Sequence, residues 1–564
     1  MKRPSLVLRG GAASESGSTG EGRRRFMVLF VPLLLVNIGC GGQDSRPSQD
    51  LTFDPGTEQD RAALFDYLLE KTMERDAFAS LADHPSYSAH PLGIDVESEM
   101  RRYRDELIAA DTDEKMWFAL QKISNVRRDR HNRVHTTEGG LTLPERPNLG
   151  RQAPIRFAVD YGRVDAPFMF VADLAEGLED VLSRVAIGDR LVAVNGRSFT
   201  EYADAMDPYQ NYSTLNNFWW HLANEVTSVA AYIPPEYYGE RLTLELRSRA
   251  GQDYVVELPY LDRSEIKWEG HGEQEYPGFT LVPDIGTYET YTLYLPTDPN
   301  LRVVLLQWHG FRLDLLEAMD RLMEYAEQHG LLDHHLIVDN TRGGGGTGGG
   351  RWEQSRGAYG IRRLQPRPYR TTFGNLKVSD EMTRWTEDVI QQIRAERVIS
   401  TQEGWLLAWL EEDVRQAIEE GRRYTNTVPH KVYAGPKWSD GIVEPASVHF
   451  RGPLTLWLSP SGGSHADQFA AIVRDNELGH TMGMAEGGYS STWNTVTVLR
   501  FPTTGRPIVG YQWSLGRTIR PNGEMLQYNP AEPHEYIPQT RDNYLEYYKN
   551  LLERTLRRTA GGIT

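Results

Sequence analysis

The sequence contains a single cysteine, Cys40, among its 564 residues. An intrachain disulfide needs two cysteines and a cysteine-rich metal site needs several, so both are excluded. Positive charge is also scarce, because 61 Lys and Arg stand against 78 Asp and Glu, which leaves a net charge of -17. This balance disfavours nucleic acid or an anionic membrane surface as the main partner, and plain solubility is its simplest explanation.

The apolar segment near the N-terminus is too short for a comfortable transmembrane helix. It spans residues 26–39 and follows three arginines, Arg23 to Arg25, which is the arrangement of an export signal. The sequence around Cys40 resembles a bacterial lipoprotein cleavage site, which would make Cys40 the lipid-bearing first residue. An ordinary secretory signal and a retained anchor are the alternatives. In each case the body of the protein is exported to the cell envelope, either periplasmic or held at the outer membrane by its lipid.

Composition and patterning divide the chain into five parts. With 39% hydrophobic and 25% charged residues, the chain is globular and long enough for two or three domains. In chain order, we expect a signal peptide at 1–40, a flexible tether at 41–60, a helical region at 61–148, a strand-rich domain at 150–262 and an α/β core at 263–564.

A motif in the strand-rich part resembles the core of a PDZ domain. A Gly188-Asp189 turn leads into a short apolar strand that ends at Asn195-Gly196, a pair typical of a tight hairpin turn. On this resemblance, residues 168–171 would be the strand that adds a bound peptide by β-augmentation. A purely structural β-hairpin is the alternative.

The segment from about residue 278 onward alternates strands and helices. Residues 303–306 form a short apolar run, and the apolar residues of 315–326 then repeat at helical spacing up to a stop at Gly330. Residues 336–338 form the next apolar run, so the pattern predicts a βαβ unit with parallel strands. Residues 352–425 are predicted to be a helical insertion, in which Ser400 and Glu403 form a capping box.

Two glycine-rich segments follow apolar runs about 120 residues apart, at 339–346 and 459–468. The second contains Ser464 at the start of a helical pattern, so strand, glycine turn, serine and helix follow one another as in a serine-nucleophile site. Backbone N–H groups at the turn and at the glycine run could hold an oxyanion. Taken alone, Ser464 is better explained as an N-cap serine after a Gly-Gly turn, because serine is a preferred cap, and the glycine run as a flexible loop.

A serine nucleophile needs a base, and the chain has 15 histidines. His465 is adjacent to Ser464, where its backbone N–H is more useful than its ring. His131 ends the N-terminal helical region within the segment 129–134. The residues alone do not choose between these candidates.

Three segments resemble the S41 peptidases, which include the C-terminal processing proteases and the tricorn core. Residues 336–346 are similar to their strand-Asp-x-Arg-Gly-x-x-Gly-Gly element, residues 464–467 to their nucleophile motif with Asp467 for Glu, and Asp129 to His131 to the Asp-x-His of tricorn-like members. The departures from the family are Tyr489, where the processing proteases carry a lysine, and Gln527, where the Ser/His branch carries a glutamate. Glu524 lies close by in the sequence.

The resemblance implies an exported serine peptidase with an α/β, crotonase-like core, an N-terminal helical cap and a PDZ-like insert. Ser464 would attack and His131 would act as base, with the backbone of Gly344 and His465 as oxyanion donors and Gln527 or Glu524 orienting the base. The implied partner is a peptide or protein substrate, with membrane contact only through the lipid; no metal, organic cofactor or nucleic acid is implied. An inactive relative that binds peptides or scaffolds an envelope complex is the alternative.

Overall fold

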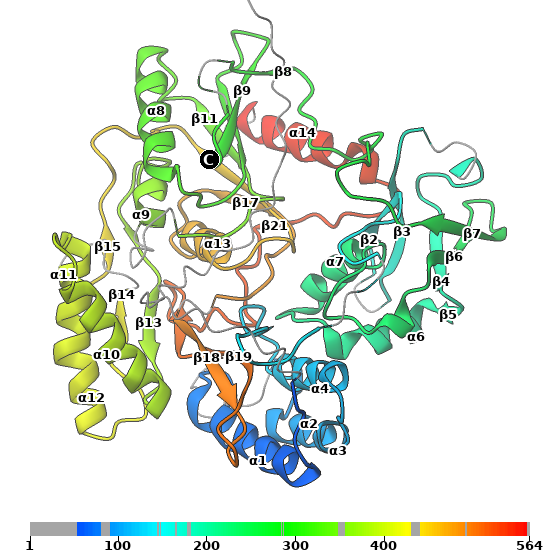
Figure 1. The fold of residues 1–564 in the computed structure, drawn as a ribbon. Helices are drawn as coiled ribbons and strands as arrows, with labels where there is room; N and C mark the ends of the chain where they lie inside the picture. The colour runs from blue at the N-terminus through cyan, green and yellow to red at the C-terminus, as the bar shows by residue number, and fades with distance from the viewer. Residues whose placement is uncertain are drawn as a thin grey trace, which may run out of the picture. The chain divides into compact units, whose positions relative to one another are not determined.

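The structure is a computed structural model that describes residues 53–79, 91–143, 146, 148–163, 166–177, 182–283, 285, 287–347, 356–429, 440–490 and 493–560. The predicted signal peptide, with Cys40, lies outside the described residues. The helices and strands are labelled in Figure 1. None of the helices within the described ranges combines the length and the apolar character that crossing a membrane requires.

Helices form the first part of the described chain: α1 (Glu58–Arg75), α2 (Val96–Arg102), α3 (Arg104–Ile108) and α4 (Asp113–Asn125). Hydroxyl side chains fix two of their starts, because Thr57 and Thr112 each accept a hydrogen bond from the backbone three residues on. The buried face of α4 carries Trp117, Leu120 and Ile123.

A twisted antiparallel sheet follows, with strand order β2-β3-β4-β6-β7 and β5 paired to β4. Its strands are β2 (Ile155–Asp160), β3 (Phe168–Leu174), β4 (Arg190–Val194), β5 (Arg197–Ser198), β6 (Arg241–Arg247) and β7 (Asp253–Pro259). The helices α6 (Phe199–Met206) and α7 (Leu215–Glu225) lie between β5 and β6 in the chain. The predicted hairpin turn is confirmed, since Asn195 and Gly196 both have positive φ, 48° and 77°, between β4 and β5.

The prediction that residues 168–171 receive an added peptide strand is wrong. These residues belong to β3, which pairs with β2 on one side and with β4 on the other. A strand flanked on both sides has no free row of backbone donors and acceptors for a peptide. The strand is interior because the segment before it, β2, occupies the edge that the sequence pattern had left to a ligand.

A seven-stranded sheet forms the centre of the second half, in the order β21-β17-β16-β11-β10-β9-β8. Its strands are β8 (Phe279–Leu281), β9 (Tyr291–Pro296), β10 (Val303–Trp308), β11 (His335–Asp339), β16 (Leu454–Leu458), β17 (His480–Gly483) and β21 (Glu535–Tyr536). Neighbouring strands from β10 to β21 run parallel, and β9 and β8 complete the sheet antiparallel. The carboxyl ends of the parallel strands therefore lie at one edge of the sheet.

The predicted βαβ unit is confirmed by β10, α8 (Leu315–Gln328) and β11. The buried side chains of α8 are Leu315, Ala318, Met319, Leu322, Met323 and Ala326. Burial of a large apolar side chain stabilises a fold by ~1.5–3 kcal/mol, so this face fixes the helix against the sheet. Gly330, with φ 67°, ends the helix where the sequence predicts it.

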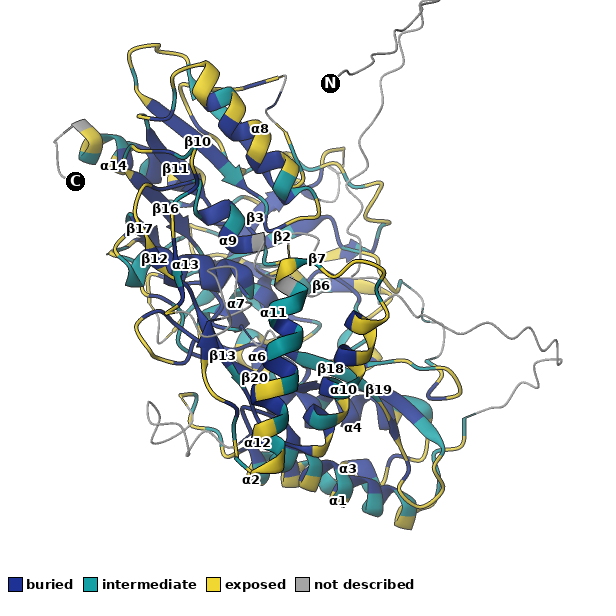
Figure 2. Ribbon diagram, turned by 90° about the vertical axis from the view of Figure 1, so that its left-hand side faces the viewer, coloured by how far each residue is buried: buried dark blue, intermediate teal, exposed yellow. Residues whose placement is uncertain are grey.

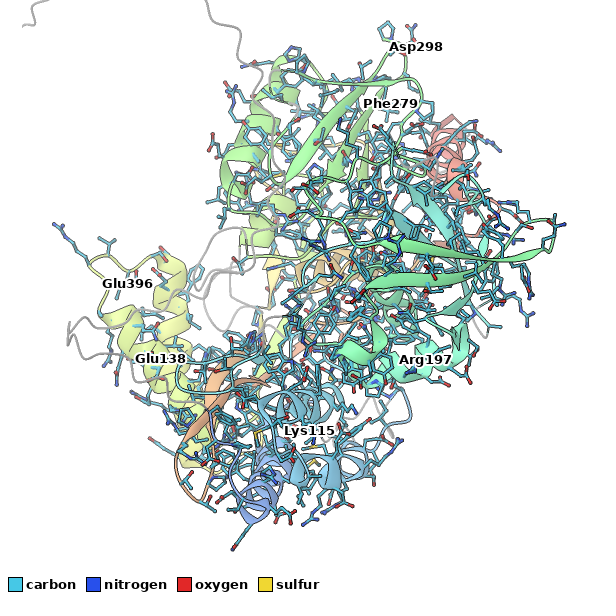
Figure 3. All side chains as sticks on the ribbon, turned by 45° about the vertical axis from the view of Figure 1, so that its right-hand side comes forward. Lys115, Glu138, Arg197, Phe279, Asp298 and Glu396 are labelled. Atoms are coloured by element: carbon cyan, nitrogen blue, oxygen red, sulfur yellow. The ribbon has the colours of Figure 1, made fainter. Side chains whose placement is uncertain are left out.

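Helices cover both faces of this sheet. On one face α8, α9 (Arg356–Ile361) and α13 (His465–Asp475) share a core with the strands, and on the other face α14 (Tyr547–Ala560) packs over Ile337, Trp457 and Met482. The central strands are accordingly among the buried segments in Figure 2. Charged side chains such as Lys115 and Asp298, labelled in Figure 3, are exposed.

The segment predicted as a helical insertion contains both helices and short strands. Within residues 352–425 the helices besides α9 are α10 (Asp380–Arg394), α11 (Thr401–Trp409), a π-helical turn (Leu410–Val414) and α12 (Arg415–Glu419), and the strands are β12 (Tyr369–Arg370) and β13 (Phe373–Leu376). The strands β14 (Val428–Pro429) and β15 (Ile442–Val443) follow after it. The capping box of Ser400 and Glu403 is confirmed.

Two short sheets join sequence-distant parts of the chain. β1 (Val134–His135), which follows His131 closely, pairs with β19 (Pro507–Ser514), which in turn pairs with β18 (Asn494–Arg500). β13 pairs with β20 (Gly516–Ile519). The strand β19 therefore fixes the N-terminal histidine segment to the C-terminal third of the chain.

Candidate active site

Ser464 lies at the carboxyl edge of the seven-stranded sheet, between β16 and α13. Its backbone has φ 60° and ψ -120°, and its side chain makes no capping hydrogen bond to the helix. A residue with a Cβ atom rarely adopts positive φ, and such strain persists only where the surroundings impose it. Ser464 therefore stands at the N-cap position without capping the helix, in the strained strand-turn-helix geometry of a nucleophile elbow.

The glycine run after β11 lies directly against this turn. A Cβ atom on Gly345 would lie 2.6 Å from the Cβ of Ser464 and 3.0 Å from the backbone nitrogen of His465. Only a glycine fits at such a position. The backbone N–H of Gly344 is donated to the carbonyl of His309 at 3.1 Å, so the glycine that faces the serine is Gly345.

His465 does not face Ser464 with a free ring. Its Nδ1 lies 2.5 Å from the carbonyl oxygen of Gly346, and its ring packs 4.9 Å from that of Phe311. His480 begins β17 beside Thr455, at the amino end of the parallel strands, whereas Ser464 follows their carboxyl ends. Neither position is that of a base for Ser464.

The segment 486–490 fixes the backbone of Ser464 by hydrogen bonding. The carbonyl of Tyr489 accepts a hydrogen bond from the backbone N–H of Ser464 at 2.6 Å, and the carboxyl group of Asp467 accepts from the N–H groups of Gly488 and Tyr489 at 3.2 and 2.9 Å. Burial raises the pKa of Asp467 to about 8. Asp467, the residue that replaces the family's glutamate, thus holds the segment that holds the serine.

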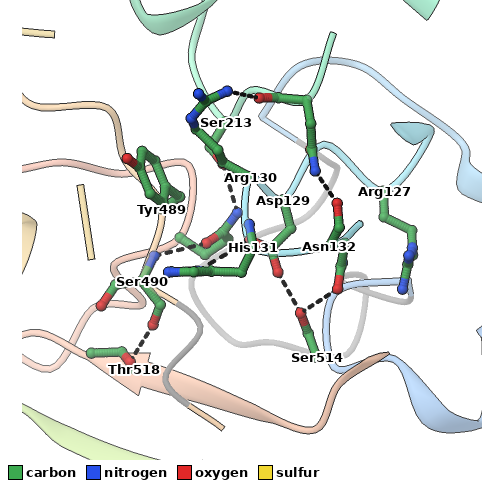
Figure 4. Close-up of polar contacts among 12 residues, drawn as sticks. Arg127, Asp129, Arg130, His131, Asn132, Ser213, Tyr489, Ser490, Ser514 and Thr518 are labelled. Atoms are coloured by element: carbon green, nitrogen blue, oxygen red, sulfur yellow. Dashed lines mark hydrogen bonds and ion pairs between the residues drawn. The ribbon is translucent and has the colours of Figure 1, made fainter. Parts of the chain in front are cut away.

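His131 follows α4 in a loop in which Arg128 has a φ of 50°. The Nδ1 atom of His131 lies 3.6 Å from the carboxylate of Asp129, and the side chain of His131 is 21% exposed whereas that of Asp129 is fully buried. Ser514, from the end of β19, donates to Asp129 and lies 3.0 Å from Oδ1 of Asn132 (Figure 4). Burial acts to raise the pKa of Asp129, but the His131 imidazole and the Ser514 hydroxyl outweigh it and leave that pKa below its ordinary value.

Tyr489 brings the serine turn and the histidine loop together. Its ring packs edge-on against the His131 ring with centroids 5.2 Å apart, and a Cβ atom on Gly463 would lie 1.9 Å from its Cζ atom. Its backbone holds Ser464, as described above. Ser464 and His131 therefore share one neighbour, at the position where the processing proteases carry a lysine.

The two residues predicted to orient the base lie differently. Gln527 is fully buried, accepts from the N–H of Ser490 at 3.1 Å and donates to Ser213 at 2.9 Å and to the carbonyl of Arg128 at 3.4 Å, so it supports the loop that carries His131. Glu524 is exposed in a turn with Asn522 and Asn529. Among the described residues no group of three or more His, Cys, Asp or Glu side chains is arranged to hold a metal ion.

Three residues of the candidate site were not predicted from the sequence: Asp129 as the carboxylate beside the candidate base, Ser514 as its support and Gly345 as the glycine facing Ser464. The Asp-x-His spacing was a signal for the first, since an Asx turn brings such side chains together; the N–H of His131 donates to Asp129 at 3.0 Å. No local pattern pointed to Ser514.

The fold is similar to that of CPAF, which is an S41 peptidase. Two solved structures carry this conclusion, mature CPAF (TM-score 0.64, 13% identity, covering 89% of this chain and 97% of that one) and mature CPAF complexed with lactacystin (TM-score 0.63, 13% identity, covering 89% and 98%). The photosystem II D1 C-terminal processing protease also matches, at a TM-score of 0.38 and 12% identity over 85% and 93%. No protein-family model matches the sequence, and no curated protein matches it.

Proposed function

We propose that this protein is a serine peptidase in which Ser464 is the nucleophile and His131 the general base. The observation that carries the proposal is the strained backbone of Ser464 at the carboxyl edge of the seven-stranded sheet. The fold of the chain, which matches that of mature CPAF over 89% of its length, supports it. A fold at 13% identity does not by itself assign a reaction, but the serine geometry is independent of it.

The reaction follows from the residues around Ser464. His131 takes the hydroxyl proton as Oγ attacks the scissile carbonyl, and returns it to the leaving amine; water then repeats the sequence on the acyl-enzyme. The N–H groups of Gly345 and His465 are proposed as oxyanion donors, each contributing ~3 kcal/mol to transition-state stabilisation. Gly345 takes the place expected for Gly344, whose N–H is already donated to His309.

Asp129 is proposed as the positioning group for His131. Its buried carboxylate lies beside Nδ1, where it would fix the ring and stabilise the imidazolium that forms in the reaction. Gln527 is neutral and bonds to the loop, so its proposed part is to hold Arg128 and the segment after it in place.

The resemblance to the S41 peptidases implies a role for each part of the chain. The seven-stranded sheet with α8, α13 and α14 would be the crotonase-like core, the helices α1 to α4 the cap, and the sheet of β2 to β7 the PDZ-like insert. The segment 1–40 is proposed as an export signal with Cys40 as lipidation site, which would place the protein in the cell envelope. Peptides or proteins of that compartment would be its substrates.

Labelling with a fluorophosphonate tests the proposal, because the probe reacts only with an activated serine. We expect one adduct, on Ser464, found by mass spectrometry of the digested protein, and loss of labelling in Ser464→Ala and His131→Ala. Lactacystin, with which CPAF was solved, is a second probe. Absence of labelling in a folded wild-type protein, or an adduct elsewhere, would overturn the assignment.

A further inference from the structure

Glu486 is a buried acid that the proposed reaction does not use. It follows β17, directly before the segment that holds Ser464, and is 1% exposed. Its Oε1 accepts a hydrogen bond from Nδ2 of Asn340 at 2.8 Å, whereas its Oε2 has no hydrogen-bond partner among the described residues. A carboxylate this deeply buried is costly to keep ionised when one of its oxygens meets no donor. The geometry therefore favours the neutral carboxylic acid.

The electrostatic surroundings agree with a neutral Glu486. Burial, and after it the nearby carboxyl group of Asp467, raise the pKa of Glu486 well above its ordinary value. In the neutral form one oxygen accepts from Asn340 and the other carries the proton. A glutamine is the closest uncharged isostere of this group, and a leucine fills a similar volume without any polar atom.

The carboxyl group of Glu486 lies between the two backbone segments of the candidate oxyanion site. On one side its partner, Asn340, follows β11 and precedes the glycine run that includes Gly345. On the other side a Cβ atom on Gly462 would lie 1.6 Å from Oε2 of Glu486, so this oxygen packs directly against the turn that leads to Ser464. One side chain thus contacts both the glycine run's base and the serine turn.

Glu486 is also continuous with the third segment of the site. The next residue, Gly487, donates its backbone N–H to the carbonyl of Gly462 at 2.8 Å, and the carbonyl of Tyr489 accepts from the N–H of Ser464. A shift of Glu486 would therefore be passed to the backbone of the serine turn on two sides. It would also release Asn340, which is fully buried.

We infer that Glu486 is a positioning residue, which holds the glycine run and the serine turn at the separation that lets the N–H groups of Gly345 and His465 meet one oxyanion together. The inference rests on the proposed peptidase function. Because oxyanion donors act on charge that develops in the transition state, a loss of this separation should slow the chemical step without weakening ligand binding.

Fluorophosphonate labelling measured as a function of probe concentration separates these two effects. The phosphonylated serine resembles the tetrahedral intermediate, so the limiting rate kinact reports on the oxyanion donors, whereas the half-saturating concentration KI reports on binding. Glu486→Leu should lower kinact at least ~10-fold and leave KI unchanged, because small displacements of positioned donors are costly. Glu486→Gln keeps an acceptor for Asn340 and should recover most of the lost rate, which a role in bulk packing alone would not require.

Asn340→Ala removes the hydrogen bond from its other end. It should lower kinact to a similar extent, and its combination with Glu486→Leu should be scarcely worse, because both substitutions break one shared interaction. Glu381→Leu is the matched control: Glu381 has a side chain that is also 1% exposed, but it lies in α10 beside Arg75 and Arg384, so kinact should stay at the wild-type value. Circular dichroism would verify the fold of each variant.

An unchanged kinact in folded Glu486→Leu, or a Glu486→Gln protein as slow as Glu486→Leu, overturns the inference. If Glu486→Leu does not fold, Asn340→Ala decides alone, and a wild-type kinact in that variant overturns it. The proposed function fails separately, if fluorophosphonate does not label Ser464 in the wild-type protein.

Discussion

The carboxylate of Asp129 lies 3.6 Å from Nδ1 of His131 and is itself fixed by Ser514, a residue at the far end of the chain. The carboxylate is fully buried, whereas the imidazole is partly open to solvent. A buried acid behind an accessible imidazole is the arrangement that orients a general base.

Asp129→Asn should lower kcat at least ~10-fold while leaving the fold intact, because an amide fills the same space but cannot compensate an imidazolium. Steady-state kinetics on a peptide substrate would measure this. In the wild type the lowered pKa of Asp129 adds stability above pH 3.8, the ordinary value. This contribution is lost as pH falls through the folded-state pKa, a loss that Asp129→Asn should not show. Unchanged kcat would remove Asp129 from the mechanism.

Ser464→Ala should abolish hydrolysis, with a fall of several orders of magnitude, yet leave the protein folded, since the hydroxyl caps no helix. His131→Ala should fall to a similar level, and the double variant should be scarcely worse because the two residues act as a unit. Circular dichroism would verify the fold of each variant. Wild-type rates in Ser464→Ala would disprove nucleophilic catalysis by this residue.

Gly345→Ala should suppress fluorophosphonate labelling, because the added Cβ would lie 2.6 Å from the Cβ of Ser464 and 2.7 Å from the carbonyl oxygen of Gly463. Backbone atoms cannot give way as a flexible side chain can. Gly404→Ala is the control: nothing lies within 4 Å of that position in α11, and Ala in a helix should stabilise by about 1 kcal/mol. Full labelling of Gly345→Ala would mean that the glycine run does not face the serine as described.

Stability should fall as pH rises from about 4 to about 8 through Asp467. Burial raises the pKa of this group from 3.8 to about 8, so between these values the unfolded chain loses a proton that the folded chain keeps. Asp467→Asn cannot ionise, and its deficit relative to wild type should shrink by a few kcal/mol between pH 5 and pH 9. Urea unfolding at both pH values measures the difference. Parallel pH curves for the two proteins would show that Asp467 does not titrate in this range.

The sequence predicted correctly those elements that are determined by residues close together in the chain. The apolar spacing of 315–326, the stop at Gly330 and the Asn195-Gly196 turn all depend on neighbours within a few residues, and the structure confirms them. The interior position of β3 depends on which strand takes the edge, and the contact of Ser514 with Asp129 depends on the pairing of β1 with β19. Such pairings join segments far apart in sequence, so no periodicity reports them.

The pairing of β1 with β19 has a consequence for when the site comes into being. During synthesis the histidine segment emerges early, whereas the serine turn, Tyr489 and β19 emerge near the end. On the proposed mechanism a nascent or truncated chain would carry a base without its nucleophile and without the hydroxyl that fixes the base's carboxylate. Peptidase activity would thus appear only after the chain has been synthesised through β19 and has folded, which would protect the proteins of the producing cell from cleavage by an incomplete chain.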